Sequence, residues 1–284
     1  MKIEYCCTHW GNEEKTLDQF FNDLLNESYS GIEINLPVNS RFDFLLYEKI
    51  QKLKSIGNFK FIAQQVLEQK NESAKAYCKR LIARLEYLII FQPDVINSHT
   101  GKDFFSFDDN CRIIEAVENF SIRHNIPIFH ETHRGRFSFH LQTLLPYLEK
   151  FPSIKLTADF SHWCNVSESM LQDQEDALNL VIPHIRHLHA RVGFEQSAQV
   201  NNPFAPEWEK YLNSFLNWWQ NILNYHINSG LETFSITPEY GPFPYMPTMP
   251  FTQEPVANPW KINAKMKTYL QNQLKLTKQC EPYL

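Results

Sequence analysis

Short β-branched or apolar stretches alternate with amphipathic stretches eight times along the chain, and this alternation limits the possible folds more than any other feature. The candidate strands are residues 3–8, 31–36, 59–66, 94–99, 126–131, 154–159, 187–192 and 232–238. The helix-like stretches that follow them are residues 16–26, 41–55, 73–91, 109–123, 138–150, 168–182, 207–228 and 258–275. This spacing predicts parallel strands joined by helical crossovers. Eight such units close into a (β/α)₈ TIM barrel, which we expect to form one domain over residues 1–284.

The rival architecture is a doubly wound open sheet. Such a sheet usually has a Gly-rich turn after its first strand. The chain has only eight glycines in 284 residues, and no Gly-rich turn follows residues 3–8. The barrel is therefore the preferred fold.

The phase of the strands predicts which side chains point toward the barrel axis. In residues 154–159, Leu156 and Ala158 point one way, while Thr157 and Asp159 point the other. The same alternation gives the inward residues at the ends of the fifth to eighth strands as Glu131, Asp159, His189 or Arg191, and Glu239. Barrel enzymes carry their chemistry at this C-terminal rim.

The stretch "TADFSHW", residues 157–163, allows two interpretations on its own. Asp159 and His162 are spaced as half of a metal site, but an aspartate at the end of a strand is also an ordinary helix cap. The matching donors on three other strands favour the metal site.

Three carboxylates and an imidazole at one rim predict a divalent cation. Buried carboxylates lose hydration and repel one another, and a cation relieves both effects. The donors Glu131, Asp159, His189 and Glu239 suit one ion of Mn²⁺, Mg²⁺, Co²⁺ or Zn²⁺. The alternative is that these are unrelated residues at strand ends, which four residues in phase on successive strands make less attractive. His187 shares a face with His189 and is a second candidate for the nitrogen ligand.

Four short motifs lie at the ends of the fifth to eighth strands: "HETHR" (130–134), "ADFSH" (158–162), "HLHAR" (187–191) and "TPEYGP" (237–242). Together they resemble the motifs of the sugar phosphate isomerase/epimerase family, whose fold is the xylose isomerase-like TIM barrel. The resemblance spans nearly the whole chain. It implies that Glu131, Asp159, His189 and Glu239 bind one divalent metal. It also implies that His162 orients the substrate and that Arg191 contacts substrate oxygens, although the spacing to Arg191 is shorter than in the ketose epimerases.

The resemblance implies proton-transfer chemistry on a carbohydrate. A metal that chelates a carbonyl and a neighbouring hydroxyl acidifies the carbon-bound proton and stabilises an enediolate. Glu131 or Glu239 would remove the proton, and the other would return it on the opposite face. This sequence of steps gives an epimerase, whereas return at the adjacent carbon gives an isomerase.

Further residues are candidates for substrate contact. Trp10 and His99 end the first and fourth strands, and His133 follows Glu131. Up to four cations are expected around the rim from the group Lys102, His133, Arg134, Arg136 and Arg191, and they motivate the hypothesis of an anionic sugar phosphate or sugar acid. The segment 242–259 carries six prolines and follows the eighth strand, so we expect an ordered wall with Tyr245 near the substrate.

Three other functions remain open. A dehydratase of an inosose or keto-sugar would use the same metal and the same first proton abstraction. An apurinic endonuclease would need further metal ligands after the seventh strand, and residues 192–208 contain neither histidine nor aspartate. A non-catalytic sugar-binding barrel would not need both Glu131 and Glu239.

Charge and composition limit the partners. A net charge of -5 is unfavourable for nucleic acid or an anionic membrane, because both are polyanions. The opening residues "MKIEYCCTHWG" lack an apolar run, and no stretch approaches the roughly 18–20 apolar residues of a membrane span. The six scattered cysteines favour reduced thiols in the cytoplasm. A homo-oligomer is an open possibility.

Overall fold

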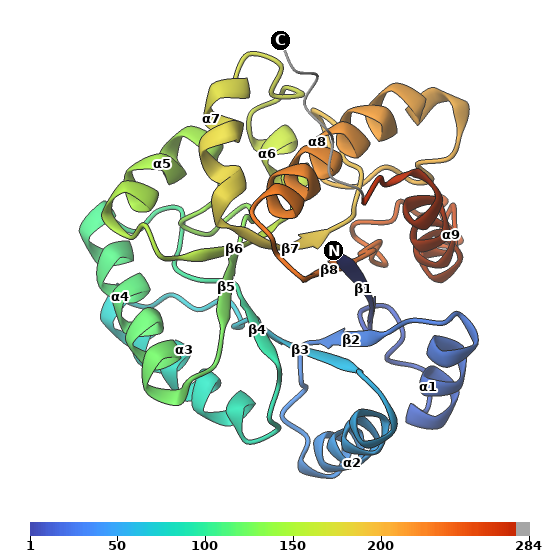
Figure 1. Cartoon of the computed structure of the whole chain (residues 1–284), viewed down its shortest axis with the longest axis horizontal. Coiled ribbons are helices and arrows are strands. Elements are labelled where there is room, and N and C mark those ends of the chain that lie inside the picture. The colour runs from blue at the N-terminus through green and yellow to red at the C-terminus, as the bar shows by residue number, and fades with distance from the viewer. Residues whose placement is uncertain (277–284) are drawn as a thin grey trace.

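A computed structural model describes residues 1–276 and has the predicted closed barrel of eight parallel strands in sequential order. Figure 1 shows the strands as an inner ring with the helices around the outside. The strands are β1 (Lys2–Thr8), β2 (Gly31–Ile34), β3 (Lys60–Gln65), β4 (Val95–Ser98), β5 (Ile128–Glu131), β6 (Lys155–Ala158), β7 (Ile185–His189) and β8 (Thr233–Thr237). Hydrogen bonds between β8 and β1 close the ring, which confirms the (β/α)₈ TIM-barrel prediction.

The helices of the described residues form the outer layer and mostly follow the predicted stretches. They are α1 (Leu17–Asn26), α2 (Ser40–Ile56), α3 (Ala74–Ile89), α4 (Phe107–His124), α5 (Leu141–Lys150), α6 (Phe160–Val166), α7 (Glu175–Val181), α8 (Glu209–Asn228) and α9 (Pro259–Gln273). Local sequence explains where several begin. The Thr16 hydroxyl accepts from the Gln19 backbone N–H, and the Gln19 side chain accepts from the Thr16 N–H, so this capping box starts α1.

Two boundaries differ from the prediction. The stretch 168–182 was expected to be one helix, but α7 begins at Glu175 and the separate helix α6 precedes it. Asp159 caps α6 with its side chain, which accepts from the Ser161 N–H at 3.1 Å. The seventh strand begins two residues earlier and ends three residues earlier than expected, so Arg191 follows β7 instead of belonging to it. The apolar alternation continues beyond His189 with Ala190 and Val192, so the sequence pattern does not mark the C-terminal end of β7.

The inside of the barrel is divided into an apolar and a polar layer. Cys6, Ile62, Val95 and Phe129 form a small buried apolar cluster. Two residues further along the same strands stand the buried polar side chains of Thr8, Gln64, Asn97 and Glu131. The apolar layer therefore closes the barrel beneath the polar one, and chemistry is confined to the C-terminal end of the strands.

Outward strand residues such as Ile32, Ile96 and Leu156 pack against the helices in the main hydrophobic core. This burial fixes the register of each strand, because a slip of one residue would exchange its two faces. Within residues 1–276, no helix combines the length and hydropathy that a bilayer crossing requires.

Candidate active site

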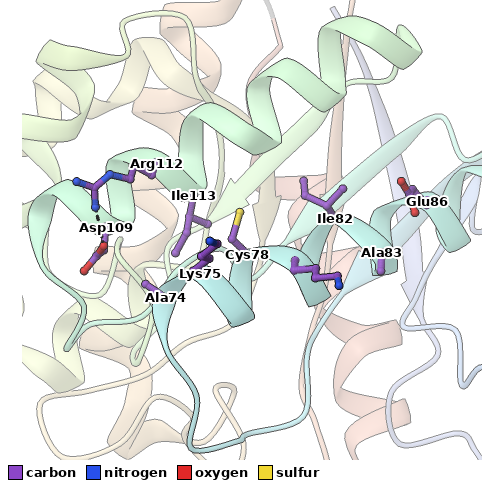
Figure 2. A pocket seen from close by; sticks show the side chains of 10 residues that line it. Ala74, Lys75, Cys78, Ile82, Ala83, Glu86, Asp109, Arg112 and Ile113 are labelled. Atoms are coloured by element: carbon purple, nitrogen blue, oxygen red, sulfur yellow. Dashed lines mark hydrogen bonds and ion pairs between the residues drawn. The ribbon is translucent and has the colours of Figure 1, made fainter.

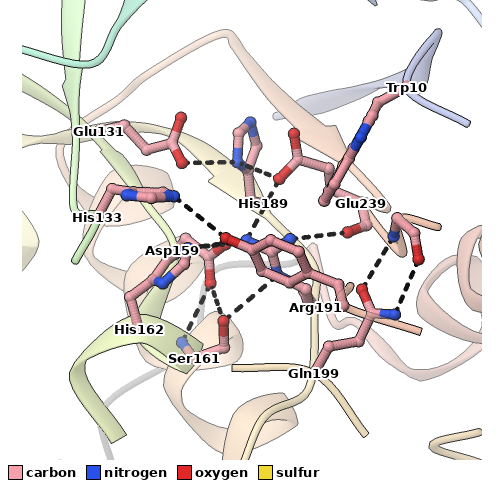
Figure 3. A network of polar contacts seen from close by, with 12 residues as sticks. Trp10, Glu131, His133, Asp159, Ser161, His162, His189, Arg191, Gln199 and Glu239 are labelled. Carbon is pink, nitrogen blue, oxygen red and sulfur yellow. Dashed lines mark hydrogen bonds and ion pairs between the residues drawn. The ribbon is translucent and has the colours of Figure 1, made fainter. Parts of the chain in front are cut away.

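The structure brings the four predicted ligand residues together at the C-terminal ends of neighbouring strands (Figure 3). Glu131 ends β5, Asp159 follows β6, His189 ends β7 and Glu239 lies two residues beyond β8. One donor atom from each lies within 4.8 Å of the others. All four residues are buried, at 5% exposure or less.

His189 is held with one ring nitrogen turned to this cluster. Its Nε2 lies 3.0 Å from Oε1 of Glu33, a fully buried carboxylate in the middle of β2. Since an ionised carboxylate only accepts, Nε2 carries the proton. Nδ1 lies 2.9 Å from Glu239 Oε2 but has no partner with hydrogen-bond geometry. Burial lowers the pKa of His189, but Glu239, Glu33 and Glu131 outweigh it and raise this pKa above its ordinary value. An ion bound among the carboxylates would displace the proton from Nδ1 and take its lone pair, as in carboxylate–histidine–metal arrangements.

Glu131 is surrounded by donors. His99 Nε2 lies 2.9 Å and Asn97 Nδ2 lies 2.8 Å from its Oε2. Burial opposes ionisation of the carboxyl, but His99 and His189 outweigh it and lower the pKa of Glu131 well below its ordinary value. Glu131 is therefore a carboxylate at neutral pH, ready to bind a cation or accept a proton.

Asp159 combines a structural and a site role. Its Oδ1 caps α6, and its Oδ2 accepts from the guanidinium of Arg191. Burial is the main influence on its carboxyl and raises the pKa of Asp159, despite the neighbouring Arg191. Oδ1 also accepts from the Ser161 hydroxyl, so Oδ2, which accepts from Arg191 alone, is the oxygen that keeps a lone pair for a cation.

A cavity of about 270 Å³ opens above these residues. Glu131 and Glu239 both line it, whereas Asp159 and His189 lie beneath its wall. Glu239 Oε1 accepts from Gln64 at 3.0 Å, which leaves its Oε2 beside His189. The two glutamates can therefore both touch a molecule in the cavity.

The donor set fits a divalent cation. Three carboxylates and an unpartnered imidazole nitrogen converge, and a buried nitrogen without a hydrogen-bond partner is costly unless another group binds it. Oxygen donors with one imidazole suit Mg²⁺, Mn²⁺, Co²⁺ or Zn²⁺, as expected, and do not select among them.

The predicted substrate contacts divide into two groups. Trp10, His99, His133 and Arg191 line the cavity with the Glu131–Glu239 pair. His162 does not line it. This residue is fully buried, its ring lies 3.8 Å from that of His133, and its Nε2 lies 3.0 Å from Arg191 Nη2.

Two details around the rim refine the sequence interpretation. Tyr245 from the proline-rich segment 242–259 does line the cavity, and its ring contacts that of Trp10 at 5.0 Å. Arg191 makes an ion pair with Asp159 and lies 3.5 Å from Glu239 Oε2. The positive charge of Arg191 is thus balanced by Asp159 and Glu239.

His187 is not available as an alternative ligand. Its Nε2 lies 3.0 Å from Glu33 Oε2, and its Nδ1 lies 2.7 Å from Ser235 Oγ. Sequence reasoning assigned no role in the metal cluster to Glu33, and it passed over Asn97 and Gln64. All three are inward polar residues of candidate strands, so strand phase is the signal that could have identified them as members of the polar layer.

A larger hollow of about 670 Å³ lies on the outer surface between α3 and α4 (Figure 2). Asp109 and Arg112 on its edge pair with each other at 2.8 Å. Its wall includes Ala74, Cys78 and Ile82 and lacks a buried cluster of acids or imidazoles. Size alone therefore does not locate the chemistry, and the smaller cavity over the barrel is the candidate active site.

No protein-family model and no curated protein sequence matches the chain. Solved structures do. The probable 3-DHS dehydratase AsbF of Bacillus anthracis is 16% identical, with a TM-score of 0.64 over 96% of this chain and 100% of that one. The IolI protein with a bound zinc atom is 11% identical, with a TM-score of 0.65 over 95% of this chain and 97% of its own.

D-psicose 3-epimerase of Clostridium cellulolyticum H10, solved with D-tagatose, is 13% identical, with a TM-score of 0.58 over 97% of this chain and 100% of that one. Other matches include xylose isomerase domain proteins, one of them in complex with magnesium. The chain therefore has the xylose isomerase-like TIM-barrel fold that its motifs predicted. Identities this low establish the fold and leave the reaction to be argued from the site.

Proposed function

We propose that the chain is a divalent-metal-dependent isomerase or epimerase that acts on a sugar, a sugar phosphate or a sugar acid. The observation that carries this proposal is the pair Glu131 and Glu239, which both line the cavity and flank Nδ1 of His189. A binding protein has no need of two buried acids that reach its ligand from different strands.

Glu131, Asp159, His189 and Glu239 would hold the ion. A divalent ion there would polarise the oxygens of the sugar and offset the negative charge that develops as a carbon-bound proton leaves. Arg191 and the ring of Trp10 would orient the sugar, because both lie on the cavity wall.

Glu131 is the better candidate for the base, because its neighbours keep it ionised. Glu239, the other acid on the cavity wall, would return the proton. With Oε2 turned to the ion, Oε1 would carry the proton, and it can still accept from Gln64 through its remaining lone pair. Return to the same carbon gives an epimer, and return to the adjacent carbon gives an aldose–ketose pair.

Support from solved structures is limited to the fold, whose other members include epimerases and a dehydratase. We also retain the cytoplasm as the proposed location, since all five cysteines of the described residues are unpaired. Assembly as a homo-oligomer stays a prediction.

The test combines metal analysis with substrate turnover. Wild type and Glu239→Gln are loaded with each of the four ions and assayed on ketoses, keto-acids and sugar phosphates in D₂O. Carbon-bound deuterium in the substrate reports proton abstraction. Loss of the second acid should lower kcat/KM by about 100-fold or more. Glu232→Gln, at an exposed glutamate just before β8, is the matched control.

Three outcomes would count against the proposal. They are absence of bound metal under replete conditions, full activity of Glu239→Gln, or no deuterium exchange with any sugar in the panel. A product that has lost water would identify a dehydratase that uses the same first step.

A further inference from the structure

Two cations beside the candidate active site are buried without an acidic partner. Lys102 and Arg136 are each only 5% exposed. Within residues 1–276, no carboxylate makes an ion pair with either one, whereas Arg80 pairs with Glu72 and Arg191 with Asp159. A buried cation loses hydration, and in exchange Lys102 has only the face of the Tyr77 ring, whose centroid lies 5.6 Å from its Nζ.

Arg136 is held by one weak contact. Its Nη2 lies 3.3 Å from Nδ1 of His99, and its buried Nε has no hydrogen-bond partner among the residues that the structure describes. A guanidinium has five N–H donors in a planar fork that matches two oxygens of a phosphate or carboxylate. The surrounding protein leaves most of these donors unused.

The two side chains come from loops that are fixed against each other. Asn110 binds the backbone of Lys102 from both sides, accepting from its N–H at 3.1 Å and donating to its C=O at 2.8 Å. The Phe137 N–H, next to Arg136, donates to Thr100 O at 3.4 Å. The loops after β4 and β5 are therefore already ordered, so little conformational entropy of these loops would be lost when an anion binds to Lys102 and Arg136.

The two charges also disfavour each other. Burial is the main cause that lowers the pKa of Lys102, and the neighbouring Arg136 lowers it further. An anion bound to both side chains would offset the repulsion between the two charges and raise the pKa of Lys102 again. Glu72 and Asp103 are near enough to raise the pKa of Lys102, but Glu72 is bound to Arg80, and the exposed Asp103 makes no ion pair within residues 1–276.

The pair adjoins the cavity through His99. The ring of His99 contacts Arg136 through Nδ1 and Glu131 through Nε2, and it lines the cavity itself. Because Nδ1 accepts from the guanidinium, Nε2 carries the proton toward Glu131. A group bound at the two cations is thus separated from the candidate base by one imidazole ring.

We propose that Lys102 and Arg136 form a subsite for an oxyanion, the phosphate or carboxylate at the end of the sugar remote from the carbon that exchanges its proton. This inference rests on the proposed function and narrows it to anionic sugars. Arg191 is a weaker candidate for that role, because its charge is already matched by Asp159 and Glu239.

The first experiment measures binding of inorganic phosphate by calorimetry, to the metal-loaded and the metal-free protein. Wild type should bind one phosphate in both forms. Arg136→Gln and Lys102→Gln should weaken it by about 10- to 100-fold, the range for a lost charge-assisted hydrogen bond. Arg112→Gln removes the same charge from an exposed arginine on α4 and should leave the affinity unchanged. Phosphate that binds only the loaded protein, or equally well to Arg136→Gln, would overturn the subsite.

The second experiment compares turnover of sugars with and without the anionic group. Wild type should favour the sugar phosphate or sugar acid over the neutral sugar in kcat/KM, and Arg136→Gln should reduce this preference by at least about tenfold. A wild-type preference for the neutral sugar would refute the subsite while leaving the proposed function intact. Phosphate binding lost in both variants, without turnover of any sugar, would support the subsite and count against the proposed function.

A third measurement separates binding from a structural role. Without phosphate, Arg136→Gln should have a thermal midpoint at or above that of wild type, because an unpaired buried charge has been removed. Residues kept for binding commonly reduce stability in this way. A clear fall in the midpoint, together with unchanged phosphate affinity, would show that Arg136 supports the loops instead.

Discussion

Glu33→Gln tests whether a buried carboxylate on β2 sets the binding properties of His189. Glu33 accepts from the ring nitrogens Nε2 of His187 and His189, each at 3.0 Å, from Asn97 at 3.0 Å and from Thr237 at 2.6 Å. Glutamine has nearly the same shape but only one acceptor oxygen. Its NH₂ group must replace the oxygen that faces His187 or the one that faces His189. In the second orientation His189 loses the acceptor that keeps its proton on Nε2, and this orientation is the one that the prediction requires.

The expected effect is on metal affinity. A proton that moves to Nδ1 of His189 occupies the nitrogen that faces Glu131 and Glu239. Loss of such an outer partner typically weakens metal binding by 10- to 100-fold, or about 1.4–2.7 kcal/mol. With free metal at 100 times the wild-type Kd, metal stabilises the wild type by about 2.7 kcal/mol. The variant should retain about 0.4–1.4 kcal/mol of that stabilisation.

The assay titrates metal against a competing chelator and repeats urea unfolding with and without metal. Thr237→Val is the control, because it removes one donor to Glu33 Oε2 and leaves the contact between Oε1 and His189 in place. Equal metal affinity in Glu33→Gln and wild type would refute the reasoning. So would an equal loss in Glu33→Gln and Thr237→Val, since the effect would then not pass through His189.

Three further predictions concern stability. In Gly31→Ala the new Cβ meets a backbone oxygen of β3 at 2.6 Å, so urea unfolding should show a loss of about 1–3 kcal/mol. Burial, with Arg186 nearby, lowers the pKa of His226 from 6.5 to about 4. As the pH falls below 6.5, this histidine takes up a proton in the unfolded chain but not in the folded protein, and the folded state loses stability. In the wild type, His226 should therefore lower the free energy of unfolding by about 1.4 kcal/mol between pH 7.5 and pH 5.5, and His226→Gln should lack this part of the decrease. Tyr240→Phe leaves the buried Val192 N–H, now 3.0 Å from the phenol oxygen, without an acceptor, and calorimetry should report a loss of about 1–3 kcal/mol.

Each of these predictions has an opposing result. Gly57 has open space around its Cα, so Gly57→Ala should stay within about 0.5 kcal/mol of wild type, and an equal effect at Gly31 would contradict the steric argument. An unchanged difference between the two pH values in His226→Gln would assign the acid sensitivity to other histidines. Wild-type stability in Tyr240→Phe would mean that the Val192 N–H finds another acceptor.

The fold followed from the sequence because its signal is repeated. Eight alternations of strand and helix agree on one architecture, so an error of a few residues at one boundary changes little. The division between α6 and α7 was missed for a local reason. Residues after Asp159 continue the apolar pattern of a strand end, and the turn residues between the two helices carry no glycine or proline.

The site was predictable where strand phase decides it. Glu131, Asp159, His189 and Glu239 converge because side chains at strand ends share one rim. The partners of each charge were not predictable, since they depend on rotamers and loop paths. Arg191 could have faced substrate freely, yet it pairs with Asp159, while Arg136 of the same expected group has no acidic partner among the described residues.

The two oxygens of Asp159 belong to different parts of the molecule. Oδ1 starts α6, and Oδ2 meets Arg191 at the edge of the metal-donor cluster. A substitution there removes a helix cap and a charge from the cluster in one step. Stability and activity should therefore change together at this residue, and a survey of variants that ranks positions by either measure alone would assign Asp159 to the wrong class.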